Sequence, residues 1–293
     1  MNTKQSSLDL YTIAAERAAA EVIESYSTSF GWSSKLLSKD VASHVRNIYA
    51  LVRVADEIVD GAAAEANEQS NAADPLSILD QMERETYQAM ECGFSSNLII
   101  HAFATTARQV GIGRDLVEPF FTSMRMDLTP RIYDQQSFEL YIYGSAEVVG
   151  LMCLKAFLEP LTISKEQDAE FVIGARALGA AFQKVNFLRD LAADFKKLGR
   201  SYFPDIRIEH FNEEQKQRLV DDIYRDLATS RAALVKLPRS SRRAVSAAQM
   251  MFSQLNDEIA STPADRLIEK RVRVSNAAKA WIFIKAWFGV ISR

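Results

Sequence analysis

The sequence predicts an all-helical protein. Its 293 residues include only 11 glycines and 7 prolines, so long segments contain no turn signal, and alanine, the strongest helix former, is abundant in them. With 48% hydrophobic residues, the chain can bury a large core, either as one large domain or as two small ones.

Chain breakers divide the sequence into a series of expected helices. The hydroxyl-rich segment Tyr26–Phe30 interrupts the first helix, and the small, polar segment Gly61–Pro75 is expected to be a mobile loop. The expected helices cover residues 8–25, 39–60, 76–92, 95–110, 114–126, 137–158, 165–198, 212–235, 239–260 and 275–291.

Charge and composition exclude several classes of protein. A net charge of −3 gives no basic field for nucleic acid. Only Cys92 and Cys153 are present, which indicates a reduced, cytosolic setting without a disulfide framework. The three histidines are scattered and are expected to be surface or locally bonded residues. No apolar signal core opens the chain, and no stretch reaches the roughly 20 apolar residues of a membrane span.

The apolar C-terminal segment Ala277–Val290 has two interpretations. It is short and is interrupted by Lys279 and Lys285. It is either a terminal helix docked on the core or a helix that lies on a membrane surface.

Two pairs of aspartates stand four residues apart in different expected helices. Asp56 and Asp60 share one helix face, because residues at this spacing lie within about 40° of each other. Tyr49 and Arg53 fall on the same stripe. Since an ordinary buried stripe is apolar, this one faces solvent or forms a site. The guanidinium of Arg53 suits the geometry of phosphate.

The second pair, Asp190 and Asp194, shares its face with Gln183 and Asn186, all within about 80°. Side-chain carbonyls and carboxylates supply the hard oxygen ligands that Mg²⁺ requires. Two such faces meeting across a helical bundle would hold several Mg²⁺ ions, and those ions would bind a diphosphate. Arg189 flanks the face, where it can hold phosphate oxygens.

Other patterns are less specific. Gly179, on the second face, is expected to keep that face open. A third pair, Asp222 and Asp226, lies in a charged run without an amide face and is interpreted as solvated surface. A third helix carries one further face, which is either core packing or the wall of an apolar tunnel with a tyrosine hydroxyl as its polar group. The residues of this face are Tyr141, Ser145, Val148, Val149 and Met152.

With these residues in place, the chain resembles the squalene/phytoene synthases, which are head-to-head prenyl transferases. The resemblance runs from about residue 27 to 274 and implies one domain over 1–293, a single helical bundle of the class I isoprenoid synthase fold around a central apolar cavity. Three segments carry it, namely YALVRVADEIVD at 49–60, YGSAEVVGLM at 143–152 and LGAAFQKVNFLRDLAADFKKLGRSYFP at 178–204.

The resemblance also implies roles for individual residues. The implied catalytic residues are Asp56, Asp60, Asp190, Asp194, Tyr141 and Arg53. The implied Mg²⁺ ligands, with Mn²⁺ as an alternative ion, are Asp56, Asp60, Asn186, Asp190 and Asp194. The implied substrate-binding residues are Ser27, Ser29, Phe30, Tyr49, Gln183, Asn186, Arg189, Tyr202 and Arg271, and Asp127 matches a further polar position near the diphosphates. Three positions depart from the family: Glu147 stands where a small residue is usual, Tyr26 where many relatives have His or a small residue, and Phe252 where relatives often carry tyrosine.

The implied reaction is the condensation of two geranylgeranyl diphosphates through a cyclopropyl (prephytoene) diphosphate to phytoene, the first step of carotenoid biosynthesis. The alternative is a C15-using squalene or dehydrosqualene synthase, and a non-catalytic assembly factor of the same fold is a third interpretation. NADPH is not expected, because a non-reductive enzyme has no use for it. The long apolar chains of the substrates imply a cytoplasmic protein that works at a membrane surface, which it would contact through Trp281, Ile284, Trp287 and Phe288.

Overall fold

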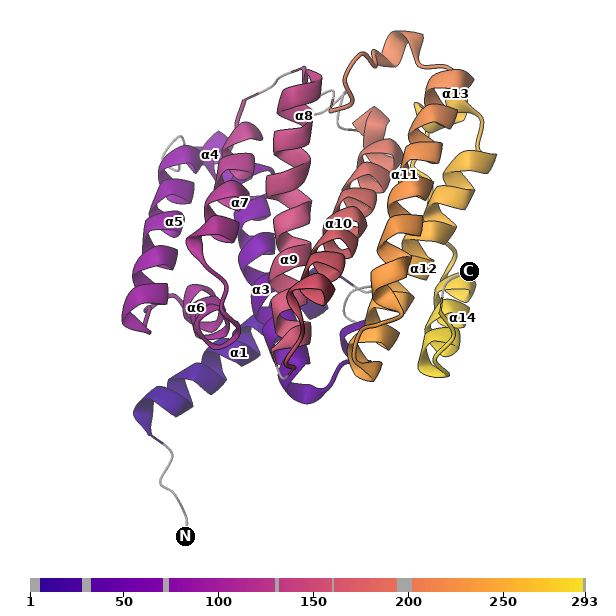
Figure 1. The fold of residues 1–293 in the computed structure, drawn as a ribbon. Helices are drawn as coiled ribbons and strands as arrows, with labels where there is room; N and C mark the ends of the chain where they lie inside the picture. Colours follow the sequence, from indigo (N-terminus) through magenta and orange to yellow (C-terminus); the bar gives the residue numbers. More distant parts are fainter. Residues whose placement is uncertain are drawn as a thin grey trace.

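The computed structural model describes residues 6–27, 33–70, 74–129, 132–159, 161–193 and 202–291. Within these ranges the regular structure is helical and contains no β-strand, which confirms the predicted class. Figure 1 shows the longer helices side by side as a bundle. The α-helices of the described residues are α1 (Ser7–Tyr26), α3 (Lys39–Val59), α4 (Ala62–Ser70), α5 (Pro75–Cys92), α6 (Leu98–Val110), α7 (Arg114–Met126), α8 (Gln135–Ile142), α9 (Val148–Leu158), α10 (Lys165–Ala193), α11 (Glu213–Leu234), α12 (Arg239–Ser261), α13 (Ala264–Leu267) and α14 (Asn276–Trp287).

Local sequence signals account for the ends of α5 and α6. The side chains of Asp74 and Asn97 accept hydrogen bonds from the first free backbone N–H groups of their helices. Gly93 and Gly111 end the same helices in the left-handed conformation, with φ of 82° and 75°, which a glycine adopts without steric cost.

The expectation of a loop over Gly61–Pro75 was wrong, because residues 62–70 form α4. The segment is rich in alanine, glutamate and glutamine, which are strong helix formers. Its polarity is that of an exposed helix rather than of a loop. The carboxylate of Glu57 accepts a hydrogen bond from the backbone N–H of Ala62 at 3.0 Å, and this contact satisfies one free donor at the start of α4.

A π-helical turn, Tyr143–Glu147, joins α8 to α9, so Gln135–Leu158 is one continuous helix. Among the described residues it is the one helix long and apolar enough to cross a membrane by length and composition. It packs against α3, α7 and α10 inside the bundle, and core helices of soluble proteins pass the same test, so the evidence for a span is weak. π-Turns of this kind are frequent at functional sites.

The continuous helix contributes to both large groups of buried apolar side chains. Tyr141 and Ile142 belong to the group around α10, α11 and α12. Val148 and Met152 belong to the group around α3, α5, α6 and α7. A Cβ on Gly179 of α10 would lie 2.6 Å from the carbonyl oxygen of Ala146. Gly179 therefore permits close packing of two helix backbones, and the expectation that it keeps a face open was wrong.

The aspartates of the third pair are not simply solvated. Lys184 of α10 donates hydrogen bonds to Asp222 at 2.6 Å and to Asp226 at 2.7 Å, both on α11. The exposed fractions of the side chains are 14% for Lys184, 38% for Asp222 and 23% for Asp226. Burial raises the pKa of Asp226, and the lysine opposes that shift. The charged stripe of α11 thus has a partner on α10, which the local sequence did not reveal.

Two histidines, the buried His101 and the partly buried His44, are bonded to neighbouring side chains, as expected. The His101 ring lies 3.0 Å from the hydroxyl of Thr12, and the His44 ring lies 3.1 Å from that of Thr106. Burial lowers the pKa of both imidazoles. These contacts tie α6 to α1 and α3.

The C-terminal segment docks on the core, as the first interpretation expected, and the membrane-surface interpretation stays a prediction. Ile282 and Ala286 of α14 are buried, and the helix packs against α12, at the lower right of Figure 1. The opposite face of α14 stays open, with 57% of Trp281 and 78% of Phe288 exposed.

Candidate functional site

The first functional face lies near the end of α3. Arg53 forms an ion pair with Glu57 one turn later, and its guanidinium also lies 3.9 Å from Asp56. The same guanidinium stands 4.4 Å from the ring centre of Tyr26. Tyr49 is half-buried, which raises the pKa of its hydroxyl, while Arg53 and a hydrogen bond with Ser27 oppose that rise. The predicted stripe of phenol, guanidinium and carboxylate is therefore assembled.

Asp56 has an unusual electrostatic environment. Surrounding protein desolvates its carboxyl and raises the pKa from 3.8 to about 7, and Arg53 opposes this rise. The negative charges of Asp127, Asp60 and Glu57 raise the pKa further. The side chain nevertheless keeps 42% of its surface accessible. The carboxyl is thus poorly solvated yet open to a ligand, which is typical of a functional group.

Asp127, directly after α7, connects this face to the centre of the bundle. Its side chain is 4% exposed. The hydroxyl of Tyr141 donates a hydrogen bond to one carboxylate oxygen at 2.6 Å, and that of Tyr202 donates to the other at 3.2 Å. Burial and the nearby carboxylate raise the pKa of Tyr141 well above its ordinary value, so this tyrosine keeps its proton at neutral pH.

Stacked aromatic rings hold the two tyrosines in place. Tyr202 lies parallel to Phe187 of α10, with ring centres 3.9 Å apart and planes inclined by 4°. Tyr141 lies 5.2 Å from Tyr202 and 5.8 Å from Phe187. Tyr133 completes the group, 5.3 Å from both tyrosines. Such contacts fix ring orientation, so the hydroxyls are directed at Asp127 by packing.

Core packing, the first interpretation of the third helix, holds for two residues of its face, and the tunnel wall stays a prediction. Val148 and Met152 are fully buried and belong to the apolar core. Ser145, in the π-turn, has a buried hydroxyl without a hydrogen-bond partner. Glu147 turns outward, where it accepts a hydrogen bond from Arg176 at 2.5 Å and lines an outer groove. The departure at this position therefore does not obstruct the interior.

The second functional face lies near the end of α10. Asp190 accepts hydrogen bonds from Arg189 at 3.1 Å and 2.5 Å, one to each carboxylate oxygen. Arg271 approaches the same oxygens at 2.6 Å and 3.1 Å. Arg271 comes from the segment after α13 and is half exposed. Asp190 thus gathers two guanidiniums, each of which presents planar donors that match phosphate oxygens.

Gln183 and Asn186 are partly exposed on α10. Ser29, Phe30 and Asp194 lie outside the described residues. Phe252, the second departure from the family, stacks on Phe182 with ring centres 3.8 Å apart.

The acidic residues fit a divalent cation in part. Among the described ranges, no group of three or more His, Cys, Asp or Glu side chains is close enough to hold a metal ion, and Asp194 is not in these ranges. The carboxylates that raise the pKa of Asp56 form a local excess of negative charge, which a divalent cation would neutralise. The donor set is therefore of the right chemistry for Mg²⁺, and metal binding stays a prediction.

Sequence reasoning did not assign a role to Glu57. This residue pairs with Arg53 and also accepts the Ala62 N–H. Its position four residues after Arg53 was the available signal, since such pairs meet on one helix face.

A comparison with protein families identifies the class of this helical protein. The family model described as squalene/phytoene synthase matches residues 23–278. The chain therefore belongs to the squalene/phytoene synthase family, as the sequence motifs indicated.

Individual relatives are distant in sequence. The chain is 26% identical over 297 residues to a phytoene synthase of Cereibacter sphaeroides, covering 94% of this chain and 80% of that protein. It is 26% identical over 211 residues to a 4,4'-diapophytoene synthase of Staphylococcus haemolyticus, covering 70% and 66% of the two chains.

Solved structures agree on the fold. A dehydrosqualene synthase in complex with a ligand superimposes with a TM-score of 0.76 at 19% identity, over 96% of this chain and 98% of that one. The squalene synthase HpnC of Alicyclobacillus acidocaldarius gives 0.72 at 18% identity, over 90% and 97%. The chain thus has the all-helical isoprenoid synthase fold.

Proposed function

We propose that this protein condenses two molecules of geranylgeranyl diphosphate head to head, through prephytoene diphosphate, to phytoene. The observation that carries the proposal is the pair of functional faces on α3 and α10, each of which combines carboxylates with guanidiniums. Similarity over 94% of this chain and 80% of a bacterial phytoene synthase supports the choice of reaction.

The arginines would bind the diphosphate groups of the two substrates. Arg53, on α3, and Arg189 and Arg271, beside α10, occupy separate faces, as two diphosphates require. Each guanidinium is held by a carboxylate, so its orientation is fixed before the substrate arrives. Preorganised donors of this kind stabilise the charge that develops on a departing diphosphate.

Mg²⁺, when bound by Asp56, Asp60, Asn186, Asp190 and Asp194, would neutralise negative charge on the diphosphates and so assist their departure. The chain's own residues prepare for this. Repulsion among Asp56, Asp60 and Asp127 raises the free energy of the ionised ligand-free site, so a cation is bound more favourably there.

Tyr141 would act next to the reacting carbons as a neutral hydroxyl. Its proton is directed at Asp127 Oδ2, and its high pKa keeps that proton in place. A hydroxyl that donates one bond still has lone pairs on its oxygen. These can stabilise a nearby carbocation, while the stacked rings around Tyr202 exclude water that would capture it.

A product assay tests the proposal directly. The purified protein is incubated with Mg²⁺ and either geranylgeranyl or farnesyl diphosphate, with and without NADPH, and the hydrocarbons are identified by mass and absorbance. We expect a C40 polyene from geranylgeranyl diphosphate that forms without NADPH. An Asp56→Asn/Asp190→Asn double variant, assayed in the same way, gives the background level of product.

The alternative is a C15-using enzyme that makes squalene or dehydrosqualene. It is favoured by the similarity to the dehydrosqualene synthase structure over almost the whole chain and to a 4,4'-diapophytoene synthase. A C30 product from farnesyl diphosphate in the same assay would establish this alternative and refute the C40 specificity. A folded protein that converts neither substrate would contradict catalysis and favour the non-catalytic interpretation.

A further inference from the structure

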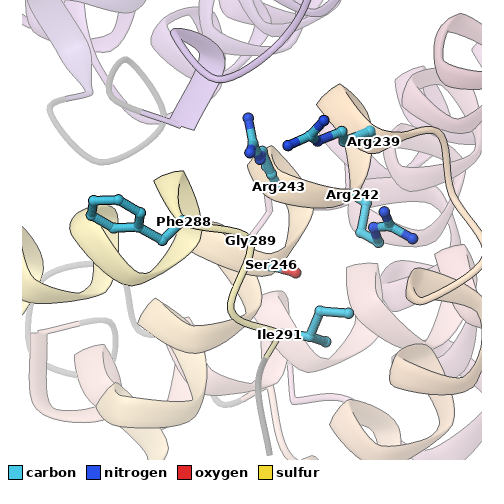
Figure 2. A pocket seen from close by; sticks show the side chains of 7 residues that line it. All are labelled: Arg239, Arg242, Arg243, Ser246, Phe288, Gly289 and Ile291. Atoms are coloured by element: carbon cyan, nitrogen blue, oxygen red, sulfur yellow. The ribbon is translucent and has the colours of Figure 1, made fainter.

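A pocket of ≈ 360 Å³ opens between the start of α12 and the end of α14. Figure 2 shows its lining side chains, with the three arginines, Arg239, Arg242 and Arg243, at the start of α12 and Phe288, Gly289 and Ile291 at and after the end of α14. The lining residues are Arg239, Arg242, Arg243, Ser246, Phe288, Gly289 and Ile291.

Several hydrogen-bonding groups of this pocket have no partner. Ser246 is 1% exposed, and its hydroxyl makes no hydrogen bond. The buried Nε of Arg243 is also without an acceptor. Buried polar groups are almost always hydrogen-bonded in folded proteins. The Ser246 hydroxyl and the Arg243 Nε–H, both without partners in one pocket, therefore indicate a ligand that brings acceptor oxygens.

The local charge selects an anionic ligand. Among the ion pairs of the described residues, none includes Arg239, Arg242 or Arg243. The sequence contains no Asp or Glu over residues 235–256 or 270–293, although the whole chain has a net charge of −3. The pocket is thus a locally cationic region on an acidic protein, and guanidiniums bind phosphate through paired, planar donors.

The end of α14 is shaped to form the pocket. Gly289 has a φ of 82°, and the following N–H, of Val290, donates to the carbonyl of Lys285 at 2.9 Å. This turn brings the chain back across α12, so that a Cβ on Gly289 would stand 4.0 Å from Nε of Arg243. The left-handed conformation favours glycine at this position.

An exposed apolar face lies directly beside the pocket. Trp281, Ile284, Trp287 and Phe288 are 57%, 44%, 54% and 78% exposed, and they lie on the side of α14 opposite to the buried Ile282 and Ala286. The ammonium of Lys285 stands 5.5 Å from the ring centre of Trp281. Exposed tryptophans next to basic side chains are typical of helices that lie in a membrane interface.

We propose that this end of the protein docks on an anionic phospholipid bilayer. The pocket binds the phosphate of one lipid headgroup through Arg239, Arg243 and Ser246, while the aromatic face of α14 enters the acyl boundary. The basic pocket and the exposed apolar face together favour a membrane as the ligand. A soluble phosphate would bind in the pocket but would leave the tryptophans exposed to water. This inference goes beyond the proposed function and does not depend on the reaction.

Co-sedimentation with vesicles tests the proposal. The full chain is mixed with vesicles of phosphatidylcholine alone or of phosphatidylcholine and phosphatidylglycerol in a 7:3 ratio, near 0.1 M salt. The test variant is Arg239→Gln/Arg243→Gln, and the matched control is Arg207→Gln/Arg266→Gln, which removes the same charge from exposed residues elsewhere. Each cation at an anionic surface contributes roughly fivefold to binding, so the test pair should lose about 25-fold.

We expect the wild type to prefer the anionic vesicles and the control to lose less than about threefold, since its arginines lie outside the contact. In a Trp32→Phe background only Trp281 and Trp287 remain, and their emission should shift to shorter wavelength on anionic vesicles. The proposal is overturned by equal losses in both variants, by equal binding to neutral vesicles, or by an unshifted emission. Displacement by millimolar inorganic phosphate at constant ionic strength would also overturn it and assign the pocket to a soluble anion.

Discussion

Removal of the Asp56 charge should make the ligand-free protein more stable at alkaline pH. In the fold this carboxyl has a pKa raised from 3.8 to about 7, chiefly by desolvation. A raised pKa means that the folded state resists ionisation, so the wild type loses stability as the pH rises from about 4 to 7. Above pH 7 the penalty is complete. Asn at this position carries no charge and avoids the penalty.

The size of the effect follows from the shift and from the exposure of the side chain. A shift of about three pKa units corresponds to roughly 4 kcal/mol. Since 42% of the side chain is accessible, solvent screening reduces this to on the order of 1 kcal/mol. For a chain of this length, about 1 kcal/mol corresponds to a rise of about 2 °C in Tm.

The assay is chemical denaturation of wild type and Asp56→Asn at pH 5 and pH 8, both with EDTA. The stability advantage of the variant should be larger at pH 8 than at pH 5. Asp221→Asn, which alters an exposed carboxylate on α11, should show no such change with pH. An Asp56→Asn variant that gains nothing at pH 8 would refute the electrostatic reasoning. The same variant should lose at least about 10²-fold in catalytic rate, which separates stability from function.

Other substitutions address the interior. Tyr141→Phe removes a hydrogen bond to the buried Asp127. It should lower the free energy of unfolding, measured by urea denaturation, by about 1–3 kcal/mol, because Asp127 loses one donor. Lys184→Met leaves Asp226 without its partner across two helices and should cost about 1 kcal/mol, with the reaction rate retained. Gly179→Ala places a methyl group against the backbone of the π-turn and should lower stability by about 1–3 kcal/mol, with a parallel loss of activity.

Each of these has a matched control. Tyr143→Phe alters a partly exposed tyrosine two residues away and should leave the free energy of unfolding in urea unchanged. Lys236→Met breaks an exposed pair with Glu170, for which a loss near zero is expected. Ala177→Ser adds an atom to α10 on its outer groove, without the cost of Gly179→Ala. Equal effects in a variant and its control would contradict the interaction assigned to that residue.

The predictable part of the molecule is the part determined by local pattern. Turn signals and long segments without them located most elements, since these signals act within a few residues. The stripe of Tyr49, Arg53 and Asp56 on α3 followed from spacing alone. The loop assigned to residues 61–75 failed because alanine and glutamate were weighed as small and polar residues rather than as helix formers.

Contacts between distant segments were less accessible to sequence reasoning. The partner of Asp222 and Asp226 is Lys184, 38 and 42 residues away. The double hydrogen bonding of Asp127 requires Tyr141 and Tyr202, from two further parts of the chain. Only the resemblance to the family pointed to Asp127, because nothing in its local sequence indicates that it is buried or which residues face it.

Among the described residues, the two faces of the site differ in their balance of charge in the ligand-free protein. Around Asp56, the described carboxylates outnumber the single guanidinium of Arg53. Around Asp190, two guanidiniums face one described carboxylate. We therefore expect the binding of a diphosphate to depend more strongly on a bound cation at the α3 side than at the α10 side.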